Sequence, residues 1–404
     1  QVPLISHEIG QYSVYPDLTE IPAYTGVLEP LNFIAVKNDL KKKGMLDLAG
    51  DFTQASGKLA AMLYKEEIER ALKTNSFDGF QLLQLQDFPG QGTALVGLLN
   101  AFWESKGIIS AEEFRKFNSP LVPLIRFEKA IYVEGENFLA SIEVSNYLKN
   151  LENQTIEWQI INDEGNVLFK GTINNLDLII GNNIELGKID IPIKIEKAQE
   201  WNVEIKLKGT EYQNHWPIWV YPSSMPNHPK NTIITSSFEE AITALNQGKK
   251  VLLNPDLNQL KGNKGRFTPV FWSPVHFPDQ PGTMGLLIDK EHMALQDFPT
   301  QSFTQWQWWD LCINSKASPI DSLPVKPIVR VVDNFVTNQH LANIFEVKIG
   351  NGKLIFSSMD LRSNLEDRPA ARQLRQSLLN YMESETFDPI STITVEQLGT
   401  LRLE

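Results

Sequence analysis

The stretch QVPLISHEIGQY, residues 1–12, decides how the rest of the chain is interpreted. Val2 to Ile5 form a short apolar run, which is typical of a buried parallel strand. The run ends in His7 and Glu8, and α/β folds bind their ligands at the carboxyl ends of parallel strands. We therefore expect Glu8 to be a reactive carboxylate. On this stretch alone, the alternative that Glu8 is a solvated loop residue stays open.

The segments that follow repeat the same pattern of strand and helix. Apolar spacing predicts helices over residues 32–43, 56–73 and 93–104, with Ser56 as the N-cap of the second. Between the last two helices, residues 80–87 read as a second strand that ends in polar groups. Strand, helix and strand in this order are typical of a (β/α)8 barrel, which has eight strands. We expect the other strands to lie upstream, in a longer protein.

Two motifs carry a resemblance to a known family. The residues from His7 to Tyr12 resemble the seventh-strand nucleophile motif of glycoside hydrolase family 2. Residues 79–92, with Gln-Asp-Phe-Pro-Gly-Gln-Gly, resemble the eighth strand of family 2-like proteins of Bacteroidetes. The resemblance implies a retaining, β-galactosidase-like exo-glycosidase that acts on polysaccharide-derived oligosaccharides. It makes Glu8 the nucleophile and places the acid/base Glu upstream of this chain.

The resemblance also implies which side chains contact the sugar or orient Glu8. These are His7, Gln11, Tyr12, Gln86 and Asp87. The family's eighth strand often ends in a Trp, whereas Leu85-Gln86-Asp87 stands there in this sequence, so the sugar stays open. Trp306 belongs to a tryptophan-rich segment, Gln305 to Asp310, that could stack on sugar rings or pack inside the protein.

The pattern predicts four parts. Residues 1–118 are the carboxyl-terminal part of a TIM barrel. Short alternating strands over 119–222 predict an immunoglobulin-like β-sandwich, with Trp158 and Trp201 in its core. Residues 223–385, which begin in a proline-containing linker, read as a parallel flavodoxin- or amidotransferase-like α/β domain. Its Cys312 lacks a strand-turn-helix elbow, so we expect no catalysis there. Residues 386–404 form a tail.

Composition limits the partners. The net charge of −12 argues against nucleic acid or an anionic membrane as the main partner. One cysteine and six scattered histidines predict no disulfide and no metal site, and we expect no cofactor. The expected partners are an oligosaccharide substrate and an upstream segment that completes the barrel. The resemblance alone implies a periplasmic or secreted enzyme. A non-catalytic carbohydrate-binding or scaffold protein remains the alternative.

Overall fold

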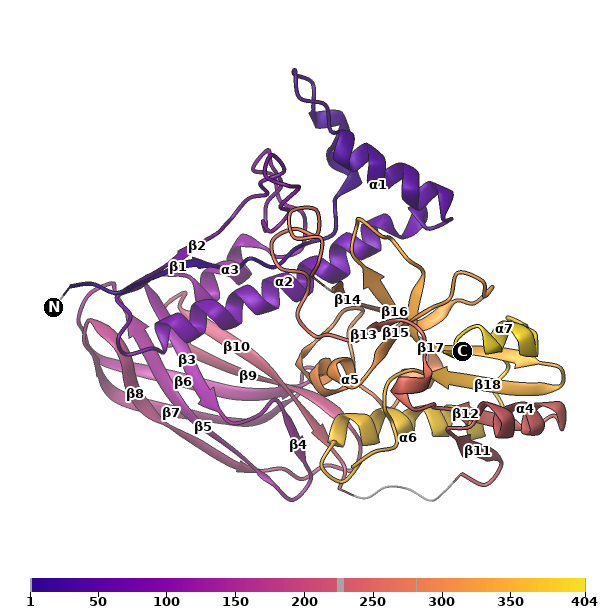
Figure 1. Cartoon of the computed structure of the whole chain (residues 1–404). Coiled ribbons are helices and arrows are strands. Elements are labelled where there is room, and N and C mark those ends of the chain that lie inside the picture. The colour runs from indigo at the N-terminus through magenta and orange to yellow at the C-terminus, as the bar shows by residue number, and fades with distance from the viewer. Residues whose placement is uncertain (1, 224–228, 281, 404) are drawn as a thin grey trace. The chain divides into compact units, whose positions relative to one another are not determined.

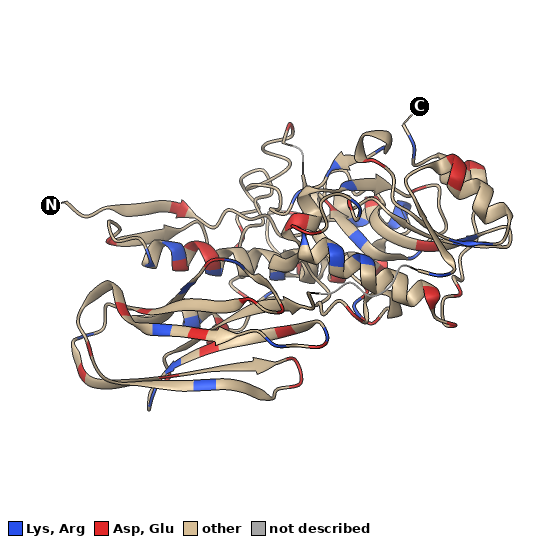
Figure 2. Cartoon of the chain, turned by 90° about the horizontal axis from the view of Figure 1, so that it is seen from below, with Lys and Arg blue, Asp and Glu red and all other residues tan. Residues whose placement is uncertain are grey.

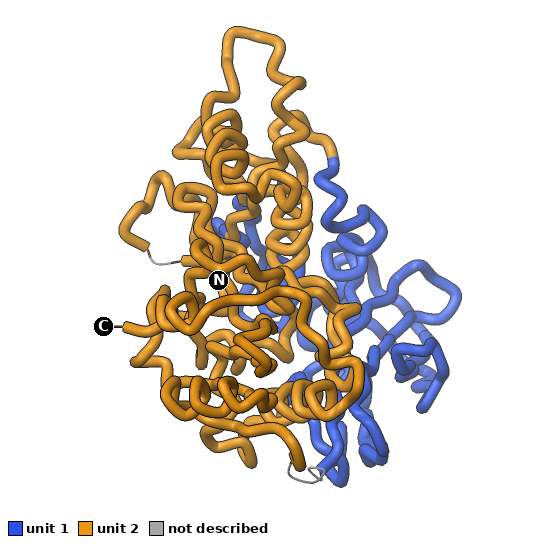
Figure 3. Tube along the Cα trace, turned by 90° about the vertical axis from the view of Figure 1, so that its right-hand side faces the viewer, with its two compact units in different colours: residues 1–11, 61–85, 105–223 blue, residues 12–60, 86–104, 224–404 orange. Residues whose placement is uncertain are grey.

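The computed structural model describes residues 2–223, 229–280 and 282–403 (Figure 1). Residues 224–228 of the predicted linker lie outside the described residues. The chain divides into two compact units (Figure 3): the first comprises residues 1–11, 61–85 and 105–223, and the second comprises residues 12–60, 86–104 and 224–404. Both units combine helices with sheets. Acidic and basic residues are interspersed along their helices and strands (Figure 2).

The first strands form a small parallel sheet in the first unit. β1 (Ile5–Ile9) pairs in parallel with β2 (Gly79–Leu82). The parallel pairing agrees with the prediction, but the predicted burial is wrong: Val2, Leu4 and Ile5 are 86%, 50% and 51% exposed. Among the described residues this sheet has only these two strands, which leaves these apolar side chains at least half exposed. Two strands cannot close a barrel, and no TIM barrel is present in the described part of the chain.

The rest of the first unit is a β-sandwich preceded by α3 (Ala111–Phe117). One sheet is antiparallel, in the order β3 (Leu121–Phe127), β5 (Asn137–Asn146), β8 (Gly181–Pro192). The other has the order β4 (Ile131–Val133), β10 (Gln213–Tyr221), β9 (Gln199–Leu207), β6 (Leu151–Asn162), β7 (Val167–Leu178). Alternating apolar residues of both sheets share one core. Trp201 is buried in it, and the half-buried Trp158 packs against it.

Of the two α-helices that follow β1, the second is longer than expected. η1 (Leu18–Ala23), α1 (Leu31–Lys42) and η2 (Leu46–Leu48) precede α2 (Ala49–Leu72). α1 confirms the predicted helix. The prediction of Ser56 as an N-cap is wrong, because Ser56 lies inside α2. Its Oγ is 2.6 Å from the Phe52 carbonyl oxygen, a bond to the preceding turn that a helix interior permits.

The predicted helix over residues 93–104 is wrong. This segment is a loop whose apolar side chains, including Leu95 and Leu98, are nevertheless buried. A Cβ at Gly97 would lie 2.2 Å from the Gln86 carbonyl carbon, so the loop backbone packs directly on another backbone segment. Asn100 Oδ1 accepts hydrogen bonds from the amides of Phe102 and Glu104 and holds a turn. Buried apolar residues alone therefore misled the helix prediction.

The second unit contains a mixed sheet. β11 (Thr232–Thr235), β12 (Lys250–Leu253) and β18 (Gly352–Ser357) are parallel neighbours, and α4 (Phe238–Asn246) packs on them. β17 (Leu341–Ile349) then pairs antiparallel with β18. The predicted parallel layer is present in β11, β12 and β18, but the sheet as a whole is mixed. Ile349 of β17 faces Gly352 of β18 across a two-residue turn, Gly350-Asn351. Such a tight hairpin joins only antiparallel strands.

The remaining elements extend this sheet or cover it. The further strands are β13 (Asn263–Lys264), β14 (Thr283–Ile288), β15 (Lys316–Pro319) and β16 (Pro327–Asp333). The further helices are η3 (Leu257–Gln259), η4 (Met293–Leu295), η5 (Trp306–Trp308), α5 (Trp309–Ile313), α6 (Pro369–Glu383) and α7 (Val395–Gly399). β14 and β16 are antiparallel, and β16 also pairs with β17.

Candidate functional site

Glu8 lies near the carboxyl end of β1, in contact with a histidine. His7 Nε2 is 3.1 Å from Glu8 Oε1, and the Glu8 side chain is 45% exposed. The other ring nitrogen of His7, Nδ1, is 2.6 Å from Gln81 Oε1 of β2. His7 therefore links the Glu8 carboxylate to the neighbouring strand. An exposed carboxylate oriented by an imidazole can act as a nucleophile or as a proton acceptor.

The backbone at Glu8 has an uncommon conformation. Its φ is +55°, in the left-handed region that residues other than glycine rarely adopt. The ladder between β1 and β2 is irregular between Ser6 and Ile9, the segment that contains Glu8. Strained backbone of this kind clusters at binding and catalytic sites, so the observation supports a functional role for Glu8.

The loop after Glu8 is held on the part of α2 that belongs to the same unit. Gly10 has a φ of +83°, and a Cβ there would lie 2.0 Å from the Tyr64 ring, so only glycine fits. The Gly10 amide donates to Glu67 Oε2 at 2.6 Å. Gln11 Nε2 donates to the Glu8 carbonyl at 2.9 Å. The support around Glu8 therefore comes from both β2 and α2.

The other predicted contact residues belong to the second unit. Tyr12 forms an isolated bridge with Phe271, and Gln86 forms one with Leu99. Asp87 is 4% exposed, and its Oδ1 accepts the Gly97 amide at 2.9 Å. The structure thus brings His7, Glu8 and Gln11 together in one unit. Tyr12, Gln86 and Asp87 belong to the other unit.

The tryptophan-rich segment combines buried and exposed rings. Trp306 stacks on Phe267 with ring centroids 5.2 Å apart. Trp308 is fully buried, and its Nε1 donates to Thr300 Oγ1 at 2.9 Å. Trp309 is about half exposed. At least two of these rings therefore serve packing inside the second unit.

The β-sandwich has a groove that was not predicted from the sequence. Its volume is about 810 Å³, and side chains of β6, β7, β9 and β10 line it. The polar lining residues are Lys116, Glu157, Gln159, Lys170, Thr172, Glu204, Lys206, Gln213, Asn214 and His215. Many alternate along their strands with core residues, so they share the outer face of one sheet. This alternation in the sequence could have predicted an outer polar face on each strand. Only the pairing of distant strands brings these polar residues together in one groove.

Next to this groove, Glu69 of α2 is a buried carboxylate with four donors. Its oxygens accept Asn214 Nδ2 and Trp216 Nε1, each at 2.8 Å, and Lys73 Nζ lies 3.3 Å away. Lys65 Nζ forms a further short ion pair with it. Burial by itself would raise the pKa of Glu69. The lysines and hydrogen bonds outweigh burial, so its pKa is below the usual 4.5.

His215 lies between the groove and this network. Its Nε2 is 3.7 Å from Glu113 Oε2 of α3. Burial, followed by the charges of Lys65 and Lys116, lowers the pKa of His215 to about 4. The ring is therefore neutral at pH 7, and the groove presents an imidazole without charge.

His215 predicts a dependence of stability on acid. Because its folded pKa is below the unfolded value of 6.5, the unfolded chain takes up the proton first. The stability that the neutral ring contributes is present above pH 6.5 and is lost as the pH falls toward 4. We expect His215→Gln to lose less stability than the parent chain between pH 7 and pH 5. Amide hydrogen exchange of residues 199–221 at both pH values measures this, and equal losses would contradict the assignment.

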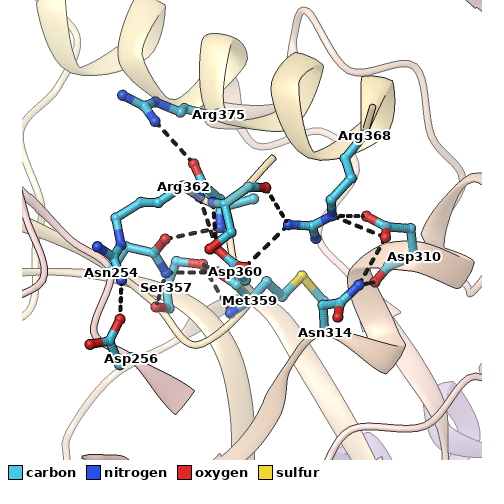
Figure 4. A network of polar contacts seen from close by, with 12 residues as sticks. Asn254, Asp256, Asp310, Asn314, Ser357, Met359, Asp360, Arg362, Arg368 and Arg375 are labelled. Carbon is cyan, nitrogen blue, oxygen red and sulfur yellow. Dashed lines mark hydrogen bonds and ion pairs between the residues drawn. The ribbon is translucent and has the colours of Figure 1, made fainter. Parts of the chain in front are cut away.

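The second unit contains a polar network where β12 and β18 end (Figure 4). Asn254 Nδ2 donates to the carbonyls of Ser357 and Met359 at 2.8 and 2.7 Å. Arg368 Nε lies 2.8 Å from Asp310 Oδ2, and Arg368 Nη1 lies 3.3 Å from Asp360 Oδ2. Figure 4 shows these groups directed at one another, so the network braces the loop after β18.

Other candidate chemistry is weak in the described residues. Cys312 is buried, and burial raises the pKa of its thiol far above the usual range, so it is no nucleophile. Across residues 2–223, 229–280 and 282–403, no group of three or more His, Cys, Asp or Glu is arranged to hold a metal ion. Within the same residues, no helix has the length and apolar character needed to span a bilayer.

Comparisons with known proteins give partial matches. The family model described as a domain of unknown function (DUF8487) matches residues 232–402, and a second domain of unknown function (DUF8488) matches residues 136–222. Among curated proteins, none matches the sequence.

Some solved structures are similar over part of the chain. Exo-chitosanase CsxA of Amycolatopsis orientalis is 16% identical over 46% of this chain and 21% of its own, with a TM-score of 0.28. A Parabacteroides merdae β-glucuronidase is 9% identical over 33% of this chain and 21% of its own, with a TM-score of 0.20. The CARDB domain of a Pyrococcus furiosus protein is 12% identical over 25% of this chain and 93% of its own, with a TM-score of 0.20. This chain covers about a fifth of the two glycosidases.

Proposed function

We propose that this chain is the carboxyl-terminal portion of a retaining exo-glycosidase that acts on polysaccharide-derived oligosaccharides. The observation that carries the proposal is the setting of Glu8. Its half-exposed carboxylate lies near the carboxyl end of a parallel strand, on left-handed backbone, 3.1 Å from His7 Nε2. This combination of exposure, orientation and strain suits a nucleophile.

In this proposal Glu8 attacks the anomeric carbon while the bond to the leaving oxygen breaks. A second carboxyl group protonates that oxygen, and a glycosyl ester forms on Glu8. The second group, now a carboxylate, removes a proton from water, which attacks the anomeric carbon and releases Glu8. His7 orients the Glu8 carboxylate, and Gln11 holds the backbone behind it.

We assign the acid/base Glu to a segment upstream of this chain, which would also complete the barrel. The exposed apolar side chains of Val2, Leu4 and Ile5 support this part of the proposal. An isolated two-stranded sheet with exposed apolar residues is stabilised when more strands or helices cover it. A periplasmic or secreted location belongs to the same proposal.

The predicted site residues of the second unit have two different proposed roles. Tyr12, Gln86 and Trp306 are proposed sugar contacts, because each is partly exposed. The Asp87 carboxylate is buried against the Gly97 amide, which favours a role in positioning the loop.

Mechanism-based labelling tests the proposal. The protein encoded by the complete gene is treated with a panel of 2-deoxy-2-fluoro glycosides, and the modified peptide is mapped by mass spectrometry. We expect an adduct on Glu8, because the fluorine slows hydrolysis of the glycosyl ester. Turnover of aryl glycosides with the adduct on another carboxylate would refute the nucleophile assignment.

The groove on the β-sandwich favours a second candidate function, non-catalytic carbohydrate binding. Its volume of about 810 Å³ and its amide, hydroxyl and charged lining could accommodate an oligosaccharide. In the labelling experiment this function predicts no turnover and no adduct, with oligosaccharide binding that is retained when Glu8 is replaced by Gln.

A further inference from the structure

Arg330 of β16 is a partly buried arginine. Its strand neighbours in the sheet are Leu287 of β14 and Ala342 of β17. Its Nη1 atom is buried and has no hydrogen-bond partner. Arg368, in contrast, pairs with two carboxylates. Because a buried donor without a hydrogen-bond partner is costly, a partner from outside the described residues is expected at Arg330.

Arg330 lines a cavity of about 280 Å³ in the second unit. The polar residues around it are Asp51, Gln54, Asp289, Ser302 and Lys326. The apolar ones are Leu48, Ala55, Leu287, Ile288 and Pro327. Sites for drug-sized ligands span about 300–1,000 Å³, so this cavity suits a smaller molecule with both polar and apolar faces.

The charges around the cavity select a monoanion. Lys326 Nζ lies 2.6 Å from Asp289 Oδ2, so these two charges offset each other. Asp51 adds a negative charge on the same wall. Since Lys326 offsets Asp289, Asp51 is the remaining negative charge, and it repels a dianion such as phosphate more strongly than it repels a single carboxylate bound to Arg330. Burial lowers the pKa of Arg330.

We propose that this cavity, the Arg330 pocket, binds a small hydroxy carboxylate, such as the monoanion of a sugar acid. The guanidinium takes the carboxylate in a forked hydrogen bond, for which its geometry is suited. Hydroxyl groups of the ligand donate to Asp51 and contact Ser302. This site is independent of Glu8, and its test needs no glycosidase activity.

Calorimetry of the whole chain tests the pocket with four probes: D-gluconate, D-galacturonate, D-galactose and inorganic phosphate. We expect saturable binding of at least one of the two sugar acids at one site per chain. Galactose, which lacks the carboxylate, should not bind, and phosphate should bind more weakly than the sugar acid. No sugar-acid binding, or tighter binding of phosphate, would overturn the proposal.

Variants separate binding from folding. Arg330→Met should weaken sugar-acid binding about 10-fold or more, the value of a charge-assisted contact. It should not lower Tm without ligand, because it removes a buried donor that has no hydrogen-bond partner. Arg402→Met, a matched arginine paired with Glu239 on the surface, should bind like the parent chain. Unchanged binding by Arg330→Met would overturn the proposal.

Asp51→Asn keeps the test decisive if Arg330→Met fails to fold. Asp51 is exposed, so its substitution should leave the fold intact. Removing its charge should strengthen phosphate binding relative to the parent chain, because the dianion then meets less repulsion. Unchanged phosphate binding by this variant would show that Asp51 does not face the ligand and would overturn the assigned charge balance.

Discussion

Glu8→Gln should reduce glycosidase turnover at least about 10³-fold, which corresponds to roughly 4 kcal/mol of transition-state stabilisation. The amide has the shape of the carboxylate but cannot attack the anomeric carbon. It can still contact His7, so the local fold should be kept. The measurement is kcat/KM for an aryl glycoside with the protein encoded by the complete gene.

A second variant distinguishes a lost nucleophile from a damaged site. Glycine suits the left-handed backbone at residue 8, where φ is +55°, so Glu8→Gly should fold. Azide should restore turnover of an activated glycoside in this variant and give a glycosyl azide of inverted configuration. Glu66→Gln is the control, because Glu66 is a carboxylate of α2 paired with Arg70 and should leave activity unchanged. Full activity of Glu8→Gln would remove Glu8 from the mechanism.

Glu69→Leu should destabilise the first unit by about 3–5 kcal/mol, as expected when one partner of a buried ion pair is removed. The Glu69 side chain is 1% exposed, and its loss leaves the Lys65 charge without its partner. Asn214 and Trp216 each lose an acceptor 2.8 Å away. Hydrogen exchange of residues 199–221 measures the loss locally, which matters because a chain of two units need not unfold in one step.

The surface and the partner lysine provide controls for this prediction. Glu66→Gln on the same helix breaks the exposed pair with Arg70 and should cost less than about 1 kcal/mol. Adding Lys65→Met to Glu69→Leu should recover part of the lost stability, because the second change removes the unpaired cation. A loss below about 1 kcal/mol for Glu69→Leu alone would show that the network contributes little.

The elements that were predicted well are those whose pattern is local. α1 follows the apolar spacing that predicted a helix over residues 32–43. Buried residues alternate with less buried ones from Trp201 to Leu207 in β9, which places Trp201 in the core. Residues 93–104 show the limit of this reasoning. Their apolar content is buried by packing of one backbone segment on another at Gly97, which apolar spacing does not reveal.

The candidate sites divide in the same way. From the sequence alone, Glu8 could be singled out as a polar residue after an apolar run, in parallel strands that the structure also has. Only the tertiary structure brings Glu69 to Asn214 and lines the sandwich groove with four strands. It also leaves Arg330 Nη1 without a hydrogen-bond partner among the described residues. Periodicity in the sequence predicts which residues share one face of a helix or strand. Contacts between residues that are about a hundred positions apart in the sequence depend on how whole elements pack, and periodicity does not predict that packing.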